Sequence, residues 1–454
     1  MEQLGRQAED RPAGPTPAEA PRVVRGRYLV QVDTLDAHGV AQGAVIQTHQ
    51  SPDDDAFAAV YGPAWATHAP PARLAMVGGL PGELVEVEAE WRLPRPGRKR
   101  AKHTPPPQVR VLRVVQDVPA RVAAQCPVFG TCGGCQLQHM AYPAQLTWKT
   151  GRVCDELCAT GFAAPPVLPA LASPKAWHYR NHMRFSVNRE GQAGLTARGS
   201  RRVLPLRTCP IAEERINDTL VVLADTPLPQ PQALIRSSAA TGQVLMQPAP
   251  SVEAHARLEA AGIAVRESDL DEELGGITFR IRPSSFFQTN TAQATRMTEE
   301  VVRLLPAGPD ATLVDAYCGV GTFAALLARR AGRVIAIEES ASAIRDARWN
   351  LRDVANVSIM QAKVENVLPA LEERLDGLVI DPPRAGCQRP VLAALAARRV
   401  PRVVYVSCDP ATLARDLAYL CQTAAAYRLV SVQPLDMFPQ TAHIETIALL
   451  EAAA

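Results

Sequence analysis

The sequence predicts an α/β protein whose C-terminal part forms an open, Rossmann-like sheet. Two smaller, mostly β regions precede this part along the chain. From about Ser284 onward, apolar strand patterns alternate with helical patterns, which is typical of an α/β domain. Residues 25–115 show short strands and turns, and residues 177–281 are mostly strand. A chain of 454 residues is too long for one core. We therefore expect a disordered tail at 1–24 and domains at 25–118, 119–283 and 284–454.

Composition indicates a soluble protein of a reducing compartment. The chain is 47% hydrophobic and 21% charged, and no apolar run approaches the ~18 residues that span a bilayer. The polar N-terminus lacks an apolar signal core, so we expect a cytoplasmic protein without membrane contact. The ten cysteines are then thiols or metal ligands before disulfides. We expect a monomer with no obligate protein partner.

The N-terminal module has the pattern of a small OB-like β-barrel. Residues 26–43 give a strand and a turn with Gly39, and residues 80–93 give a turn and alternate apolar with polar side chains. Residues 47–73 are polar and proline-rich, which indicates an inserted loop.

The end of this module is strongly basic. Residues 91–115 contain no Asp or Glu and eight basic residues: Arg92, Arg95, Arg98, Lys99, Arg100, Lys102, Arg110 and Arg113. Since the net charge is only +2, a nucleic-acid partner requires a local patch of this kind. The alternative is an ordinary solvated surface, but this imbalance favours phosphate binding.

Clustered cysteines predict a metal centre in the central domain. Cys126, Cys132 and Cys135 have the spacing C-x5-C-x2-C, and Cys209 is a fourth candidate ligand. Four thiolates suit either Zn²⁺ or an iron–sulfur cluster, and the spacing alone leaves both open. Three other thiols are expected to pack rather than ligate: Cys154 and Cys158, on a predicted helix over 141–161, and Cys421.

Residues 312–340 read as a strand, a glycine turn, a helix and a second strand. Gly319 and Gly321 allow close approach of a ligand to the backbone, and Glu338 ends the second strand about 20 residues on, where a carboxylate can bind ribose hydroxyls. This pattern suits both nicotinamide cofactors and S-adenosylmethionine.

Later strand ends bring reactive groups to the same sheet edge. One predicted strand ends in Asp381, followed by two prolines and Arg384, and the next ends at Cys408. Asp409 suits a helix N-cap, so the positive end of that helix is expected to lower the pKa of Cys408. Glu445 lies in a late apolar strand, where a carboxylate needs a partner or a function.

Five motifs resemble the RNA uracil-5-methyltransferase family: SFFQTN (285–290), DAYCGVGTF (315–323), DPPRAG (381–386), VSCDPATL (406–413) and HIET (443–446). The chain is most similar to its ribosomal RNA branch. That resemblance implies a class I S-adenosylmethionine-dependent methyltransferase domain, an N-terminal TRAM barrel and a 4Fe–4S cluster in the central domain.

The resemblance also implies roles for individual residues. Cys408 matches the nucleophile, Glu445 the general base, and Phe286 an aromatic ring that packs on the target base; Arg384 at the same edge is a second candidate substrate contact. The matches to the cofactor site are Gln288, Tyr317, Glu338 and Asp381, and those to the cluster ligands are Cys126, Cys132, Cys135 and Cys209. Two positions depart from the family, which usually has Asn at Asp409 and often at Thr322.

We therefore predict methylation of uracil C5 in RNA, in 23S ribosomal RNA rather than transfer RNA. The choice depends on the barrel and the basic segment, since transfer-RNA relatives are expected to resemble the chain only from the central region onward. A nicotinamide-dependent iron–sulfur oxidoreductase is an alternative that leaves Cys408 and Glu445 without roles. A non-catalytic RNA-binding protein is a third, disfavoured by the intact pairing of these two residues.

Overall fold

The structure, a computed structural model, describes residues 23–49, 71–92 and 106–453. These residues form two compact units, one that ends at Arg121 and one that begins at Val122. The predicted tail lies outside the described residues except for Val23 and Val24, which begin the first strand, and 50–70 of the predicted inserted loop also lie outside them. In the described part of the chain, no helix combines the length and apolar composition of a membrane span.

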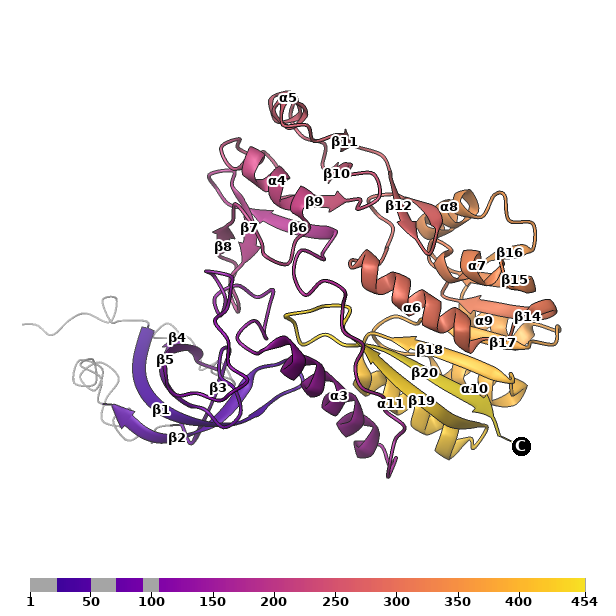
Figure 1. Ribbon diagram of the computed structural model, residues 1–454, viewed down its shortest axis with the longest axis horizontal. Helices are drawn as coiled ribbons and strands as arrows, with labels where there is room; N and C mark the ends of the chain where they lie inside the picture. Colours follow the sequence, from indigo (N-terminus) through magenta and orange to yellow (C-terminus); the bar gives the residue numbers. More distant parts are fainter. Residues whose placement is uncertain (1–22, 50–70, 93–105, 454) are drawn as a thin grey trace, which may run out of the picture. The chain divides into compact units, whose positions relative to one another are not determined.

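The N-terminal unit is a five-stranded antiparallel sheet in the order β3-β2-β1-β4-β5 (Figure 1). Its strands are β1 (Val23–Leu35), β2 (Ala41–His49), β3 (Arg73–Met76), β4 (Leu84–Arg92) and β5 (Gln108–Gln116). An isolated bridge between Val77 and Arg110 joins the two edges of the sheet. The predicted alternation in 80–93 is confirmed, because Val85, Val87 and Ala89 are buried and the residues between them are not.

The basic segment is described only at its end. Arg110 and Arg113 on β5 are exposed but pair with Glu88 (Nη2–Oε2 3.3 Å) and Glu86 (Nε–Oε2 2.5 Å) on β4. These two arginines are therefore partly neutralised by their own sheet. The side chains of the other six basic residues lie outside the described ones.

The second unit starts with a helix and a six-stranded sheet of order β11-β10-β9-β6-β7-β8. Its strands are β6 (His182–Val187), β7 (Ala193–Thr196), β8 (Val203–Pro205), β9 (Gln232–Ser237), β10 (Val244–Gln247) and β11 (Val265–Arg266). The helices are α3 (Tyr142–Ala159), which confirms the helix predicted over 141–161, α4 (Glu214–Leu223) and α5 (Val252–Ala260). A hairpin of β12 (Leu270–Leu274) and β13 (Ile277–Ile281) follows.

The C-terminal part is a seven-stranded sheet of order β16-β15-β14-β17-β18-β20-β19. Its strands are β14 (Gly308–Ala316), β15 (Ala331–Glu338), β16 (Val357–Gln361), β17 (Gly377–Ile380), β18 (Arg402–Ser407), β19 (Tyr427–Leu435) and β20 (Glu445–Ala452). The first five in spatial order run parallel, whereas β20 is antiparallel to both of its neighbours. The predicted α/β sheet is thus present.

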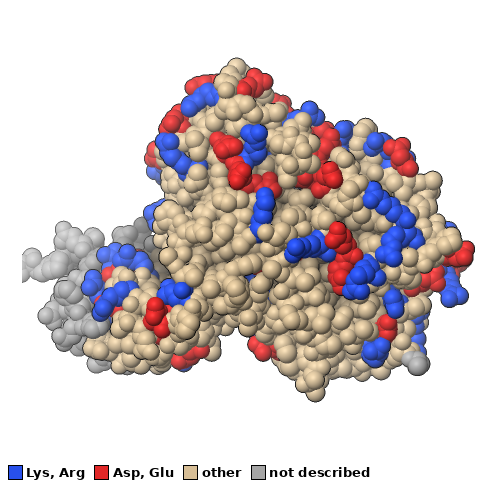
Figure 2. All heavy atoms as spheres, viewed as in Figure 1, with Lys and Arg blue, Asp and Glu red and all other residues tan. Residues whose placement is uncertain are grey.

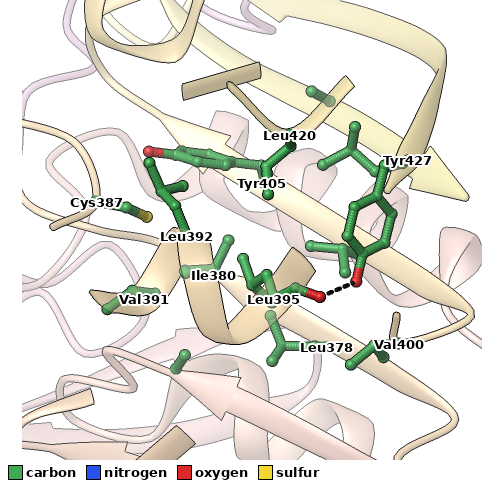
Figure 3. Close-up of a cluster of buried hydrophobic side chains, with 14 of the residues drawn as sticks. Leu378, Ile380, Cys387, Val391, Leu392, Leu395, Val400, Tyr405, Leu420 and Tyr427 are labelled. Atoms are coloured by element: carbon green, nitrogen blue, oxygen red, sulfur yellow. Dashed lines mark hydrogen bonds between the residues drawn. The ribbon is translucent and has the colours of Figure 1, made fainter. Parts of the chain in front are cut away.

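Helices cover both faces of this sheet (Figure 1). They are α6 (Thr291–Leu304), α7 (Thr322–Leu327), α8 (Ala341–Asn350), α9 (Val364–Val367), α10 (Arg389–Arg398) and α11 (Pro410–Ala418). Because both faces are covered, β17 and β18 are almost wholly buried and apolar. Figure 3 shows one of these cores, where Leu378 and Ile380 of β17 pack with Leu395 of α10 and Tyr427 donates to the Leu395 carbonyl (3.1 Å).

Candidate active site

Strand ends place the predicted reactive groups at one edge of the C-terminal sheet. Asp381 follows β17, Cys408 follows β18, and Glu445 is the first residue of β20. Ser407 pairs with Thr446 across β18 and β20, so the next residues along the ladder, Cys408 and Glu445, lie beside each other. The antiparallel course of β20 is what brings its first residue to the carboxyl edge of the parallel strands.

Cys408 lies between a strand and a helix, as predicted. Asp409 is the N-cap of α11, and its Oδ1 accepts a hydrogen bond from the Thr412 amide (3.1 Å). Pro410 begins the helix. The other carboxylate oxygen, Oδ2, lies 3.2 Å from Arg384 Nε. Both carboxylate oxygens of Asp409 therefore have a partner within the site.

The electrostatics of Cys408 differ from the prediction. The thiol is half-buried, and burial first, then the charges of Glu445, Asp381 and Asp409, raise its pKa to about 11, while Arg384 opposes the rise. The expectation of a lowered pKa is wrong because burial of the thiol, reinforced by these acids, outweighs the helix N-terminus. Thiolate formation at Cys408 thus depends on how those acids are charged.

Two of the acids beside Cys408, Glu445 and Asp381, have raised pKa values. Glu445 is only 4% exposed, and burial followed by the charge of Asp381 raises the pKa of Glu445 well above its ordinary value. Burial raises the pKa of Asp381 to about 7. Such paired carboxyls titrate together, and the first proton lost makes the second harder to remove. An acid with a raised pKa is a stronger base once it is ionised.

The glycine turn after β14 adopts the backbone that the sequence indicates. Gly319 and Gly321 have φ of 55° and 90°, and Tyr317 also has a positive φ of 66°, which a side chain adopts only under strain. Glu338 supports the turn: its Oε2 accepts from the Gly319 amide (3.1 Å) and its Oε1 from the Ser340 amide (2.7 Å). Each oxygen of a carboxylate has capacity for a further donor.

Asp315 is a candidate site residue that the sequence analysis did not select. It is fully buried at the end of β14; its Oδ2 accepts from the Ala324 amide (2.7 Å), and its Oδ1 has no hydrogen-bond partner among the described residues. Burial raises its pKa to about 8, with smaller contributions from Asp381 and Glu338. Its position at the end of a predicted strand, directly before the glycine turn, is the sequence signal that could have identified it.

The segment between β13 and α6 carries Phe286 and Gln288. Phe286 is 71% exposed, whereas the neighbouring Phe287 is 4% exposed and packs on Phe279. The Gln288 carbonyl accepts from Asn181 Nδ2 (3.1 Å), and its side chain is half-buried. A large aromatic ring held out from a fixed backbone suits contact with a base.

The four predicted ligand cysteines lie around one cavity of about 150 Å³ in the central region. Cys132, Cys135 and Cys209 are buried and Cys126 is half-buried. Burial raises the pKa of Cys135 to about 12, and the other three sulfurs add to the shift. Among the described residues, no three His, Cys, Asp or Glu side chains are arranged to hold a single metal ion.

The remaining predicted packing thiols differ from one another. Cys421 is half-buried against the core of the C-terminal sheet, as predicted. Cys158 on α3 is exposed, with its sulfur 4.0 Å from that of Cys154, so the packing prediction is wrong for Cys158.

Comparison with known proteins gives a consistent set of relatives. The model of the tRNA (uracil-5-)-methyltransferase family matches residues 251–453. An uncharacterized RNA methyltransferase of Thermosynechococcus vestitus is 37% identical, over 75% of this chain and 87% of its own length. Another from Gloeobacter violaceus is 35% identical, over 83% of this chain and 91% of its own.

A solved structure has the same fold over most of the chain. It is the Pyrococcus abyssi tRNA (uracil-54, C5)-methyltransferase in complex with S-adenosyl-L-homocysteine, with a TM-score of 0.66 and 23% identity. The match covers 93% of this chain and 99% of that one, so it extends into the N-terminal unit.

Proposed function

Because the chain belongs to the tRNA (uracil-5-)-methyltransferase family of RNA methyltransferases, we propose that it methylates C5 of a uridine in RNA, with S-adenosylmethionine as methyl donor. Cys408 is the nucleophile and Glu445 the general base. The observation that carries this assignment is the register of β18 and β20, which sets a thiol and a buried carboxyl side by side at the carboxyl edge. Family membership argues against the nicotinamide-dependent alternative.

The pairing fits the needs of the reaction. C5 of uracil is a weak nucleophile until a thiolate adds to C6, which moves the C5–C6 π electrons onto C5 and its conjugated carbonyl. S-adenosylmethionine, when bound, would supply the methyl group that joins C5, and its sulfur would keep the electrons of the broken S–CH3 bond and leave as a neutral thioether. Glu445 takes the C5 proton, the C–H electrons restore the C5–C6 double bond, and Cys408 leaves as a thiolate. The uridine must first leave its stack, at a cost of about a few kcal/mol.

The residues at the glycine turn suit S-adenosylmethionine. Asp315 has a buried oxygen with no partner in the described part of the chain, and Glu338 and Asp381 add acidic groups around the same turn. A concentration of carboxyls is unfavourable by itself but complements a sulfonium cation and ribose hydroxyls. We assign Gln288, Tyr317, Glu338 and Asp381 to cofactor binding and add Asp315 as a residue that supports the turn. Phe286 and Arg384 are assigned to the RNA substrate.

We assign the four-cysteine cavity to a 4Fe–4S cluster. Four thiols around one space of about 150 Å³ match the donor set of such a cluster. One zinc ion is the second candidate and requires four ligands about 2.0–2.3 Å from a point. The cysteine spacing, which resembles that of the ribosomal RNA branch, favours the cluster, and Cys126, Cys132, Cys135 and Cys209 would hold it. The five-stranded N-terminal sheet is assigned to a TRAM-like RNA-binding module.

Two RNA classes are candidates for the substrate. The resemblance of the sequence to the ribosomal RNA branch of the family favours 23S ribosomal RNA as the substrate. The solved transfer-RNA enzyme favours the second candidate, because its match to 93% of this chain removes the argument that transfer-RNA relatives lack the N-terminal module. Methylation of unmodified ribosomal RNA fragments and of unmodified transfer RNA, measured under the same conditions, separates the two.

The mechanism is tested with RNA that carries tritium at C5 of its uridines. Wild type should methylate and release tritium in equal amounts. Glu445→Gln should transfer the methyl group, retain tritium and remain bound to RNA on a denaturing gel, whereas Cys408→Ala should form no adduct and no product. Cys421→Ala is the control and should turn over normally. Multiple turnovers by Cys408→Ala or Glu445→Gln would disprove the assignment.

A further inference from the structure

The connection that leads into Glu445 is fixed by residues next to the ligand cysteines. We call residues 436–444, between β19 and β20, the base loop, and residues 126–138 the cysteine segment. The base loop is largely buried, with Asp436, Gln440 and Ile444 each at most 4% exposed. Because Glu445 directly follows this loop, the position of the loop sets where the Glu445 backbone begins.

Backbone hydrogen bonds join the two segments at Gln440. The Gln440 carbonyl accepts from the amides of Gln136 (3.1 Å) and Leu137 (3.0 Å), which follow Cys135 directly. Gln440 itself has a φ of 69°, a left-handed backbone that a side chain adopts only when its surroundings impose it. Gln145 of α3 provides that constraint, since it accepts from the Gln440 amide (3.1 Å) and donates to the Gln440 side chain (3.0 Å).

The Gln136 side chain spans both segments. Its Nε2 donates to the Gly133 carbonyl (3.1 Å), between Cys132 and Cys135, and its Oε1 accepts from the Ala442 amide (3.2 Å). The side-chain amide of Gln136 thus bonds to the cysteine segment through its nitrogen and to the base loop through its oxygen. Ala442 lies three residues before Glu445, so the contact reaches close to the proposed base.

The cysteine end of this link is equally constrained. The Cys126 amide donates to Gln138 Oε1 (3.1 Å), so Gln138 closes the segment on itself. Consecutive Cα atoms are separated by a fixed distance of about 3.8 Å. A displacement of Cys135 therefore reaches Gln136 without an intervening flexible linker, and from Gln136 it reaches the base loop.

Other contacts hold the first half of the base loop without passing through the cysteines. Lys149 and Asp436 form a fully buried ion pair (Nζ–Oδ1 2.5 Å), Tyr179 donates to the Pro439 carbonyl (2.9 Å), and Asn290 donates to the Met437 carbonyl (3.1 Å). In the half nearest Glu445, Gln440 is held by Gln145 and donates to the Ala176 carbonyl (3.3 Å), and Thr441 donates to the Phe438 carbonyl (2.8 Å). The contact that the cysteine segment makes closest to Glu445 is that of Gln136 with the Ala442 amide. Removal of the Gln136 side chain should therefore affect the later half selectively.

We propose that Gln136 is a positioning residue that couples the cysteine segment to Glu445 and holds this carboxyl in place for removal of the C5 proton. The inference rests on the proposed role of Glu445 as the base. It gives the cysteine site a specific effect on one step of the reaction, since methyl transfer depends on Cys408 whereas proton removal depends on the base loop.

The test is a single turnover of Gln136→Ala with C5-tritiated, unmodified RNA and labelled S-adenosylmethionine. Methyl transfer should stay within a few-fold of wild type, while tritium release should slow by roughly 10²-fold, the penalty typical of a reacting group misplaced by about 1 Å. The covalent adduct should accumulate. Gln192→Ala, which removes an exposed glutamine from a turn of the central sheet, is the matched control and should behave as wild type.

Two further measurements separate this inference from its premise. If Glu445→Gln gives no adduct, the assignment of the base fails; if Glu445→Gln is trapped but Gln136→Ala releases tritium at the wild-type rate, the coupling fails. Equal slowing of both steps would also overturn it, as a merely structural defect. Amide hydrogen exchange should increase across 440–446 in Gln136→Ala and in Cys132→Ser; unchanged exchange there in either variant would contradict the link.

Discussion

Arg384 and Asp409 form an ion pair directly beside Cys408, with 3.2 Å between Arg384 Nε and Asp409 Oδ2. The pair joins the loop after β17 to the N-cap of α11. Arg384 lowers the pKa of the Cys408 thiol and Asp409 raises it, so the two paired charges have opposite effects on thiolate formation. Since Arg384 is also a proposed RNA contact, bound RNA would compete with Asp409 for its guanidinium.

Asp409→Asn should make Cys408 more acidic. Asparagine keeps the N-cap but removes a charge that raises the pKa of the thiol, and it frees Arg384 to act on the thiolate. Removal of a raising contribution shifts the pKa down, so the acid limb of the rate–pH profile should move to lower pH. Asp353→Asn, an exposed acid outside the site, is the control. An unchanged or upward-shifted limb would contradict the assigned electrostatics.

The buried Lys149–Asp436 pair should be strongly coupled in stability. Lys149→Met alone leaves a buried carboxylate without its partner and should lower the free energy of unfolding by about 3–5 kcal/mol. The double variant Lys149→Met/Asp436→Leu should recover most of that loss. Denaturant unfolding measures both. For comparison, Arg207→Met breaks an exposed pair with Asp225 and should change stability by less than about 1 kcal/mol.

Cys209→Ser should remove the proposed cluster. Protein purified without oxygen should contain about four irons and absorb in the visible range, and this variant should lose both. Cys421→Ser, half-buried but outside the cavity, should keep the wild-type iron content. One zinc per chain with no iron in the wild-type protein would replace the cluster assignment with a zinc site.

The adjacent residues Phe286 and Phe287 should give opposite phenotypes. Phe286→Ala removes an exposed ring, so stability should change by less than about 0.5 kcal/mol. Turnover should fall by roughly 10–10²-fold, because about 1–3 kcal/mol of base stacking is removed. Phe287→Ala opens the core and should lower the free energy of unfolding by about 3–5 kcal/mol. Normal turnover by Phe286→Ala would exclude a role in RNA contact.

Removal of residues 1–121 tests the N-terminal unit, whose described part carries basic and acidic side chains at its surface (Figure 2). The remaining compact unit should still bind S-adenosylmethionine, whereas RNA affinity should fall and depend less on salt. The log–log salt slope decreases by about 0.7–0.9 for every phosphate that the protein no longer neutralises. Arg110 and Arg113 already pair with glutamates, so their individual substitution should change the slope less than the truncation. An unchanged slope after truncation would exclude the unit from RNA binding.

The parts of the site that the sequence predicted were those encoded by local pattern. The strand before Cys408, the cap at Asp409 and the alternation in β4 all follow from short-range periodicity and side-chain chemistry, and the structure has each of them. The roles of Cys408 and Glu445, in contrast, came from resemblance, and their adjacency depends on the antiparallel insertion of β20, which no local pattern specifies.

What the sequence could not supply were effects summed over distant segments. The pKa of Cys408 depends first on burial and then on acids from three separate strand ends, so the helix position alone gave the wrong direction. Gln136 and Gln440 are ordinary polar residues in sequence, and their importance arises from contacts some 300 residues apart along the chain. Asp315 was visible as a strand end, but only burial reveals its unpartnered oxygen.

The acids at the sheet edge also determine how cofactor binding responds to pH. With pKa values of about 8 for Asp315 and about 7 for Asp381, this edge retains protons at neutral pH. A sulfonium cation favours the ionised carboxylates, so its arrival would expel protons into solution. Affinity would then strengthen as pH rises toward about 8, and the heat measured on binding would vary with the ionisation enthalpy of the buffer that accepts those protons. The site thus exchanges protons for a cation.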